Sequence, residues 1–212
     1  MASGYPSVVE RLYRRKQDDF REKLRDMINP RVVYVTDLVS CSHKRVMRRQ
    51  FPLLAFRFEP ALVLGDLVHA GLESLLAGDD GWDVEVELEK RYSMEGEEYV
   101  VKGRADLVKR RVDGAVEAVV EIKTARDLPE GRPHQHHLEQ LRIYMELLGA
   151  PRGVLVYITP ERLLEFHVER GTGIDIEARL RETLHDSARP RFDWECRYCP
   201  FRKLCPYSGA NR

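Results

Sequence analysis

The chain has 212 residues, of which 43% are hydrophobic and 33% charged, and its 35 basic and 35 acidic side chains give a formal net charge of zero at pH 7. This composition excludes a disordered chain and is enough for one domain with a sizeable core. It also excludes attraction of nucleic acid by a global positive field, so such a partner would need a local basic surface. The basic residues that either form such a surface or lie on solvated helix faces are Arg11, Arg14, Arg15, Lys16, Lys44, Arg45, Arg48 and Arg49.

The sequence contains no targeting or membrane signal. No apolar run approaches the roughly 20 residues of a membrane span, and the N-terminus lacks the apolar core of a signal peptide. We therefore expect a cytoplasmic protein with no membrane partner. In that reducing compartment the four cysteines are not expected to form structural disulfides.

The N-terminal part of the chain is predicted to be helical. Residues 6–28 are charged with a sparse apolar spacing, and the proline two residues later ends this first helix. Thr36 or Asp37 caps a second helix that carries Cys41. Residues 60–78 form a third helix, because leucines recur at helical spacing between a proline and a glycine.

Beyond the third helix the apolar period changes to the alternation of strands. Asp113 and Gly114 form a two-residue turn between two alternating runs, which is typical of a β-hairpin. The predicted strands are residues 82–94, 98–111, 115–125, 153–159 and 163–169, and the predicted helices are residues 137–149 and 175–188. Helices, a three-strand meander, a crossover helix and further strands predict a mixed α/β domain. An irregular tail with three cysteines follows.

The predicted hairpin places two carboxylates opposite each other. Counting along both strands from a turn at Asp113 and Gly114 puts Glu121 directly opposite Asp106, on the same face of the sheet. Lys123 shares that face because it lies two residues further on. Like charges in such a pair destabilise a sheet unless a divalent cation lies between them. An exposed hairpin face is the alternative, and a bulge would shift the register.

Three further polar residues lie at helical positions that could bring them to the same place. His69 lies on an otherwise apolar side of its predicted helix, where a lone histidine is more often a satisfied core residue. Gln140 and Tyr144 are four residues apart, so both project from one face of the helix that follows the hairpin. Each of these signals is weak when taken alone.

The four cysteines predict one shared site. Cys196, Cys199 and Cys205 follow one another closely in the C-terminal tail, and Cys41 lies far upstream. Four cysteines with none to spare indicate a four-thiolate site, which zinc and iron–sulfur clusters both accept. The spacing does not separate these two. Unbound cysteines are a third interpretation, which the short polar setting of the tail disfavours.

Four short motifs occur in an order that resembles a known nuclease family. They are GDLVH at residues 65–69, GRADLV at 103–108, EIKT at 121–124 and QLRIY at 140–144. These motifs resemble the GxxxH, GxxD, ExK and QxxxY motifs of RecB-like nucleases of the PD-(D/E)xK superfamily. The proline that commonly precedes the metal-binding aspartate is replaced here by Ala105, a departure that RecB-like members often show.

The resemblance implies a restriction-endonuclease-like core, in which helices flank a central mixed sheet, within one nuclease domain over residues 1–212. Residues 1–60 would form an N-terminal helical part that carries the first cluster cysteine. Residues 61–189 would form the RecB-like nuclease core, and residues 190–212 a C-terminal cluster-binding tail. An iron–sulfur cluster would join the two outer parts.

The resemblance also implies a role for each motif residue in metal-assisted phosphodiester hydrolysis. Lys123 would orient or deprotonate the attacking water and stabilise charge on the phosphate. Gln140 and Tyr144 would position the nucleic acid or support the metal ligands. Carboxylates suit Mg²⁺ or Mn²⁺, and an imidazole ligand favours Mn²⁺. The implied metal ligands are His69, Asp106, Glu121 and the carbonyl of Ile122.

A subgroup of these nucleases carries one cysteine before the nuclease motifs and three after them, and holds an iron–sulfur cluster. The same layout here implies a cluster, with 4Fe–4S expected and 2Fe–2S as the alternative. The first cysteine of the subgroup often lies in a C-P-x-K or C-x-R-K motif, of which the CSHK stretch here keeps only Lys44. The implied cluster ligands are Cys41, Cys196, Cys199 and Cys205.

Short members with this layout resemble the CRISPR-associated exonucleases of family four (Cas four), which process DNA ends for spacer capture beside an integrase. We therefore expect a single-strand DNA exonuclease with CRISPR integrase proteins as partners. A general DNA-repair nuclease that works with a helicase is one alternative. A non-catalytic iron–sulfur DNA-binding protein is another, which the intact Asp106, Glu121 and Lys123 disfavour.

Overall fold

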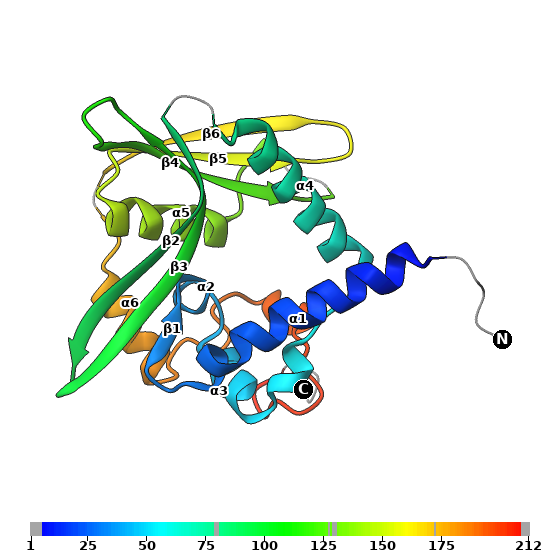
Figure 1. Ribbon diagram of the computed structural model, residues 1–212. Coiled ribbons are helices and arrows are strands. Elements are labelled where there is room, and N and C mark those ends of the chain that lie inside the picture. The colour runs from blue at the N-terminus through cyan, green and yellow to red at the C-terminus, as the bar shows by residue number, and fades with distance from the viewer. Residues whose placement is uncertain (1–5, 79–80, 127, 129–130, 172, 209–212) are drawn as a thin grey trace.

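The computed structural model describes residues 6–78, 81–126, 128, 131–171 and 173–208, and it shows a mixed sheet with helices packed on it (Figure 1). The predicted mixed α/β class is confirmed, and none of the described helices is long and apolar enough to cross a membrane. The strands are β1 Val32–Tyr34, β2 Trp82–Met94, β3 Glu97–Arg110, β4 Val116–Thr124, β5 Arg152–Ile158 and β6 Leu163–Glu169. The helices are α1 Val8–Ile28, α2 Val35–Leu38, α3 Ser42–Gln50, the 3₁₀ helix η1 Pro52–Ala55, α4 Pro60–Leu76, α5 Gln135–Leu148, α6 Ile176–Leu184 and α7 Glu195–Tyr198.

Strand β3 pairs with three other strands. One of its edges pairs antiparallel with β2 along nearly the whole length of both strands, and the other edge is shared by β1 and β4. The chain then crosses over through α5 to β5, which pairs parallel with β4, and returns antiparallel in β6. The predicted meander and crossover helix are therefore confirmed. Strand β1 has three residues and is too short to show an alternating pattern in the sequence.

The turn of the β3–β4 hairpin differs from the predicted two-residue turn. The backbone N–H of Arg111 donates to the carbonyl of Ala115 at 2.9 Å, so the loop between them spans residues 112–114. Gly114 lies in the left-handed region at φ +82°, where a residue without a Cβ carries no steric penalty. The predicted two-residue turn is therefore wrong, and the pairing next to the loop is shifted by one residue from the predicted register.

A bulge next to this loop restores the predicted register. The pairing shifts between Lys109 and Arg110, where β4 accommodates one extra residue. Beyond the bulge the facing pairs are Lys109–Ala118, Val108–Val119 and Leu107–Val120. The pairing ends at Leu107–Val120, and Asp106 and Glu121, which the sequence predicts to lie opposite each other, are the next residues of the two strands.

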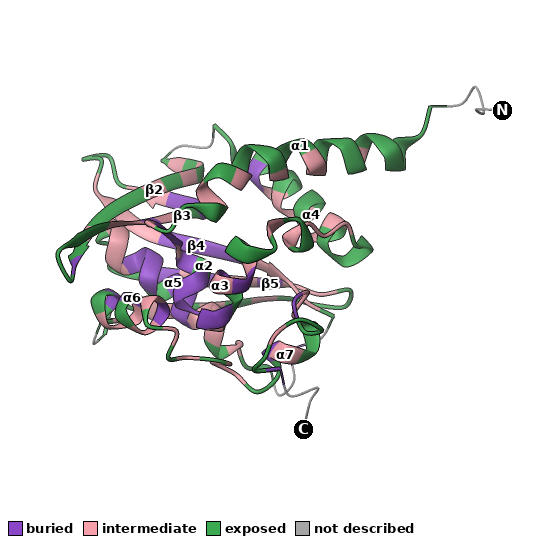
Figure 2. Cartoon of the chain, turned by 90° about the horizontal axis from the view of Figure 1, so that it is seen from below, coloured by how far each residue is buried: buried purple, intermediate pink, exposed green. Residues whose placement is uncertain are grey.

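Two helices pack against the sheet over separate apolar clusters. Helix α5 contacts β4 and β5 over the larger cluster, which includes Val101, Leu141 and Leu155. Helix α4 contacts β2, β3 and β4 over a smaller cluster that includes Ile122. Figure 2 shows buried residues gathered in α5 and the strands beneath it, whereas α1 and α4 are largely exposed. The candidate residues on β3 and β4 therefore lie between α4 and α5.

The helix predicted around Cys41 is wrong, because the chain forms two short helices there instead of one. Helix α2 begins at Val35, before both predicted caps, and α3 begins at Ser42. Two tertiary hydrogen bonds take N–H groups that a continuous helix would use. Cys41 donates to Glu195 at 2.7 Å, and Ser42 donates to the carbonyl of Ala188 at 2.8 Å. The C-terminal tail thus interrupts the helix and fixes the position of Cys41.

Lys44, Arg45, Arg48 and Arg49 form a basic cluster on α3, of which two members stabilise the fold instead of forming a surface. The guanidinium of Arg45 is buried and donates to the carbonyl of Pro30 at 2.6 Å. Arg48 forms a two-point ion pair with Asp37 at 2.7 and 2.8 Å, which ties α3 to α2. Lys44 of the same cluster is exposed. The basic surface on α3 is therefore smaller than the sequence indicated.

Gly103 of β3 lies where two neighbouring side chains leave no room for a larger residue. A Cβ at this position would come within 2.7 Å of the Tyr144 ring and 2.8 Å of Val35. We expect Gly103→Ala to lower the free energy of unfolding by about 1–3 kcal/mol, because over-packing a core forces side chains out of their preferred rotamers. Urea unfolding followed by circular dichroism measures this change.

The matched control is Gly71→Ala on α4, where a Cβ would meet nothing within 4 Å. This substitution is expected to leave the free energy of unfolding unchanged or to raise it by up to about 1 kcal/mol, since alanine favours a helix more than glycine does. Equal stability of the two variants would contradict the close packing of Tyr144 on β3.

Candidate active site

Strands β3 and β4 separate beyond their last facing pair, Leu107–Val120, and Asp106 lies in the opening. Its carboxylate is almost fully buried, and Oδ2 accepts a hydrogen bond from the backbone N–H of Ile122 at 2.7 Å. The side chain thus takes the place that a backbone carbonyl of β3 would have in a continued ladder. Asp106 and Glu121 come from facing positions at this point.

Glu121 is held through one carboxylate oxygen, while the other has no partner in the described part of the chain. Its Oε1 accepts hydrogen bonds from the Gln140 side chain at 2.8 Å and from the Lys123 ammonium. Its Oε2 is buried without a hydrogen-bond partner among the described residues. Burial raises the pKa of Glu121 to about 7; the Lys123 charge opposes this rise and the Asp106 charge adds to it. A bound cation would satisfy such an oxygen.

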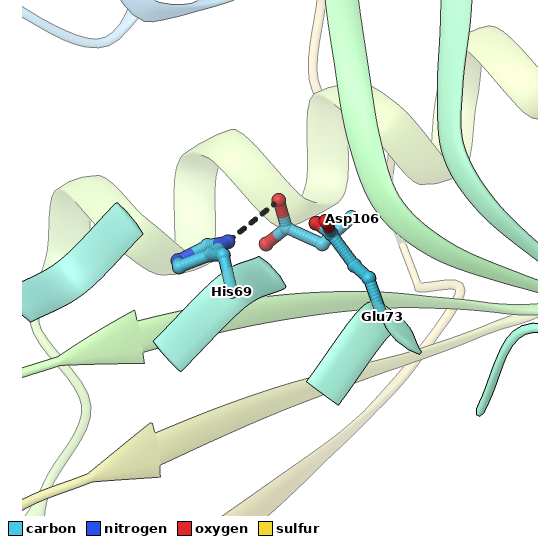
Figure 3. A group of neighbouring side chains, drawn as sticks. All are labelled: His69, Glu73 and Asp106. Carbon is cyan, nitrogen blue, oxygen red and sulfur yellow. Dashed lines mark ion pairs between the residues drawn. The ribbon is translucent and has the colours of Figure 1, made fainter. Parts of the chain in front are cut away.

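Helix α4 brings His69 to Asp106. The imidazole Nδ1 lies 3.3 Å from Asp106 Oδ1 (Figure 3). The hydrogen bond to Asp106 raises the pKa of His69 above its ordinary value, and burial opposes this rise. His69 is therefore not a core histidine with its hydrogen-bond partners elsewhere, because its ring faces Asp106, the acidic residue of the GxxD motif.

Glu73 is a further candidate ligand, which the sequence analysis does not single out. It lies four residues after His69 on the same face of α4, and only 9% of its surface is exposed. Ligand atoms of His69, Glu73 and Asp106 all lie within 4.8 Å of one another (Figure 3). Burial raises the pKa of Glu73, and the charges of Glu85 and Asp106 raise it further. The spacing from His69 was the only signal in the sequence, and a glutamate on a helix is usually solvated.

Helix α5 supports Glu121 from the other side. Gln140 and Tyr144 lie on one face of this helix, as predicted, and both are buried. Burial raises the pKa of Tyr144, and the nearby Gln140 side chain and backbone of Arg104 oppose this rise. A chain of contacts therefore runs from β3 through Tyr144 and Gln140 to the carboxylate of Glu121.

The backbone of Ile122 faces the same opening. Its side chain packs in the apolar cluster under α4, and its N–H donates to Asp106. In an extended strand the N–H and C=O of one residue point to the same side of the strand. The carbonyl of Ile122 therefore points into the gap between β3 and β4. An imidazole, two carboxylates and a carbonyl are a ligand set that suits a hard divalent cation.

The four cysteines come together from the two ends of the chain. Cys41 precedes α3, Cys196 lies in α7, and Cys199 and Cys205 follow it. All four are free thiols and line one cavity of about 310 Å³. Burial raises the pKa of Cys41 to about 11, so its thiolate needs a metal partner to form at neutral pH. Gln140 lines the same cavity, which therefore reaches the support of Glu121.

Comparisons with known proteins find a matching family and similar chains. The profile of the PD-(D/E)XK nuclease superfamily matches residues 79–206. The CRISPR-associated exonuclease Cas4 of Saccharolobus solfataricus is 38% identical over 202 residues, which cover 94% of this chain and 98% of that protein. The crystal structure of SSO0001 aligns with a TM-score of 0.84 and 37% identity, over 95% of this chain and 97% of that chain. An alkaline exonuclease from Laribacter hongkongensis (LHK-Exo) aligns with a TM-score of 0.47 and 14% identity, over 73% of this chain and 82% of that chain.

The superfamily match and the relatives cover the candidate site between them. The matched residues 79–206 include Asp106, Glu121 and Lys123, and the near full-length relatives extend the likeness over α4. The expected restriction-endonuclease-like fold and the expected metal-dependent nuclease are both confirmed. The chain belongs to the PD-(D/E)XK nuclease superfamily and, within it, to the family of the CRISPR-associated Cas4 exonucleases.

Proposed function

We propose that this nuclease is an exonuclease that hydrolyses phosphodiester bonds at the ends of single-stranded DNA. The observation that carries the proposal is that Asp106 and Glu121 lie close together on adjoining strands. The Lys123 ammonium donates to the carboxylate of Glu121. Buried carboxylates with an oxygen left unpartnered are stable as anions only beside a cation. The relative that is 38% identical is itself called an exonuclease, which supports the choice of reaction.

The chain's own groups offer the oxygen and nitrogen ligands that a divalent cation takes. A cation bound between them would lower the pKa of a coordinated water and stabilise negative charge on the scissile phosphate. Carboxylate oxygens suit Mg²⁺ or Mn²⁺, and the imidazole favours Mn²⁺. The proposed ligands are His69, Asp106, Glu121 and the carbonyl of Ile122.

Three other side chains would position the groups that take part in the reaction at this site. The Lys123 ammonium donates to Glu121 and is partly exposed, so it can also orient a water or stabilise charge on a phosphate oxygen in the opening. Gln140 holds one oxygen of Glu121, which leaves the other oxygen for the cation. Tyr144 contacts Gln140 and keeps that amide in place.

We propose that the four cysteines bind an iron–sulfur cluster and not a zinc ion. Zn–S bonds of about 2.3 Å in a tetrahedron place thiolate sulfurs about 3.8 Å apart. Among the described residues, no three of the thiol sulfurs lie within 4.8 Å of one another. A 4Fe–4S cluster spaces its thiolates more widely because each binds a different iron, and we expect this type, with 2Fe–2S as the alternative. The cluster would join residues 1–60 to residues 190–212 around a nuclease core at 61–189.

Features of the cavity rim support single-stranded DNA as the substrate. Trp194 and Tyr198 are exposed and line the cavity together with Lys44 and Arg202. Aromatic rings combined with basic side chains bind unpaired bases and their backbone. Since the relative is CRISPR-associated, we propose that the chain processes DNA ends for spacer acquisition beside integrase proteins. Digestion of DNA in general repair, with a helicase as partner, is the alternative.

Loss of either catalytic charge should abolish cleavage. Asp106→Ala and Lys123→Ala are each expected to slow digestion of end-labelled single-stranded DNA in Mn²⁺ by at least about a hundredfold, because each removes a group that binds the cation or stabilises charge in the transition state. Asp19→Ala on α1 removes an exposed acidic residue elsewhere and should keep wild-type activity. Cleavage that survives both chelation of divalent cations and the Asp106→Ala substitution would contradict the metal mechanism.

Removal of one cluster ligand should cost both iron and stability. Cys196→Ala is expected to lose the visible absorbance of the cluster and most of its iron, and to unfold at a lower temperature. The cluster closes a loop between the two ends of the chain, which on the chain-entropy model contributes up to about 4–5 kcal/mol. Iron analysis and thermal unfolding measure the two effects, with Ser93→Ala on β2 as the control. Full iron content and an unchanged melting temperature in Cys196→Ala would refute the cluster.

The raised pKa of Glu121 predicts how stability changes with pH in cation-free buffer. Between pH 4.5 and about 7 the folded state keeps a proton on Glu121 that the unfolded state releases, so stability falls as pH rises through this window. The raised pKa of His69 acts in the same direction, because its stabilisation is lost as pH rises above 6.5. The buried His136 and His137 act in the opposite direction, because their pKa values are lowered, but they are common to the wild type and to Glu121→Gln. We therefore expect the free energy of unfolding of the wild type to fall relative to that of Glu121→Gln by on the order of 3 kcal/mol from pH 5 to pH 8.

Urea unfolding at the two pH values measures this loss, and Glu121→Gln is the matched variant because it cannot ionise. The variant should lose much less stability than the wild type over the same range. Mn²⁺ added at pH 8 should restore stability to the wild type, since the cation binds the ionised carboxylate. A wild type that loses no stability relative to Glu121→Gln between pH 5 and pH 8 without cations would show that burial does not govern Glu121.

A further inference from the structure

The backbone of Glu85 has a conformation that is unusual inside a strand. Its φ is +49°, in the left-handed region, where the Cβ of an L-residue crowds the following carbonyl. Among the described residues other than glycine, Glu95 and Asp186 also have positive φ, and both of them lie in turns. Backbone strain of this kind persists only where the surrounding structure imposes it, and it is concentrated at functional sites. The conformation of Glu85 within β2 therefore needs an explanation.

The pairing of β2 with β3 is interrupted at Glu85. The facing pairs on either side of the interruption are Val84–Leu107 and Val86–Ala105. Glu85 and Asp106 lie between these pairs, and the described ladder skips them. The pairing of β3 with β4 also ends at Leu107, so Asp106 lies outside the ladder on both edges of β3.

Side chains on both strands change from one face of the sheet to the other at this interruption. On one side of it, Val84 and Leu107 pack in the apolar cluster under α4. On the other side, Val86 and Ala105 pack in the larger cluster under α5. Residues two apart in an extended strand share a face, so the change of face requires the backbone to turn about the strand axis. The left-handed conformation of Glu85 supplies this turn in β2, and β3 turns with it because the two strands are paired on both sides.

The turn determines where the Asp106 carboxylate lies. Strand β4 keeps its alternation, since Val120 and Ile122 both pack under α4. Strand β3 therefore turns away from β4 at Asp106, and the opening forms between them. In this opening the carboxylate accepts the N–H of Ile122 at 2.7 Å and lies 3.3 Å from the imidazole of His69 (Figure 3). A β3 strand without the turn would continue its ladder with β4, and a backbone carbonyl would then take the N–H of Ile122.

We propose that Glu85 is a positioning residue for the nuclease reaction, whose left-handed backbone turns the β2–β3 pair so that the Asp106 carboxylate faces the cation site. The inference rests on the proposed function, because it takes Asp106 as a cation ligand. The competing interpretation assigns the effect to the Glu85 side chain, which forms an ion pair with Arg104 at 2.6 Å and whose charge raises the pKa of Glu73. A backbone role and a side-chain role predict different effects of substitution.

Two substitutions remove the Glu85 carboxylate but favour different backbone conformations. Glycine adopts positive φ freely, whereas valine is β-branched and favours an extended strand. Mn²⁺ is titrated into the full-length, cluster-loaded protein, and the EPR signal of free Mn²⁺ gives the affinity. Glu85→Val is expected to bind Mn²⁺ at least about tenfold more weakly than Glu85→Gly, because fewer molecules populate the left-handed state that forms the site. Saturating Mn²⁺ should bring the rate of single-stranded DNA cleavage by Glu85→Val close to that of Glu85→Gly, since the cation stabilises the turned state.

Glu95 offers a matched control, because it has the same kind of strain far from the site. Its φ is +53°, and it lies in the turn that joins β2 to β3, at the far end of the strand pair from Asp106. Glu95→Gly and Glu95→Val both lose its contact with His185. The valine variant should unfold at a lower temperature than the glycine variant, with the same Mn²⁺ affinity. If circular dichroism shows that Glu85→Val does not fold, Glu85→Ala replaces it, with an expected loss of affinity of at least about threefold relative to Glu85→Gly.

The outcomes distinguish this inference from the proposed function. Equal Mn²⁺ affinities of Glu85→Gly and its valine or alanine counterpart would overturn the inference, whether both match the wild type or both fall below it. In the second case the carboxylate of Glu85, and not its backbone, would support the site. A weaker affinity of Glu95→Val than of Glu95→Gly would also overturn the inference, because remote strain would then have the same effect. In each of these cases a wild type that binds Mn²⁺ leaves the proposed function intact, whereas a wild type that binds none would overturn both.

Discussion

The hydrogen bond from the backbone N–H of Ile122 to the carboxylate of Asp106 marks the place where β3 and β4 part. Up to Leu107 the two strands form a regular ladder, and beyond it a side chain replaces the backbone acceptor. Because the strands part there, side chains from α4 and α5 reach the acidic residues from different directions. One of the proposed metal ligands thus maintains the opening in which the cation would bind.

Burial and neighbouring charges together shift the pKa values of the groups in this opening. The pKa values of Glu121, Glu73 and His69 are all raised, so each of these groups binds a proton more strongly than it would in water. A divalent cation competes with those protons for the same ligand atoms, because ligation requires the ionised carboxylate and the neutral imidazole. Cation binding at this site is therefore coupled to proton release, and it strengthens as pH rises.

Local patterns predicted most of the fold and most of the site, but not the features that depend on contacts distant in sequence. Alternation and the Asp-Gly signal gave the right register as far as Leu107–Val120, next to Asp106 and Glu121, only because a bulge compensates for the longer turn, and a bulge has no signal in one sequence. The helix around Cys41 is interrupted by acceptors from the tail, more than 140 residues away. Glu73 was missed because a helical glutamate shows its burial only when α4 is placed on β3.

Helix α5 contributes to both of the proposed metal centres. Gln140 lines the cysteine cavity and also donates to Glu121, so a change in the cavity can reach the carboxylate of Glu121 directly. The tail is fixed through Glu195, whose carboxylate accepts backbone N–H groups of Cys41, Arg191 and Phe192 at 2.7–2.9 Å. A cluster that holds the tail in place would also keep α5 in place. Loss of the cluster would disturb Glu121 first, because Glu121 depends on Gln140 of α5. Asp106 would be disturbed later, because it depends on the backbone of β4.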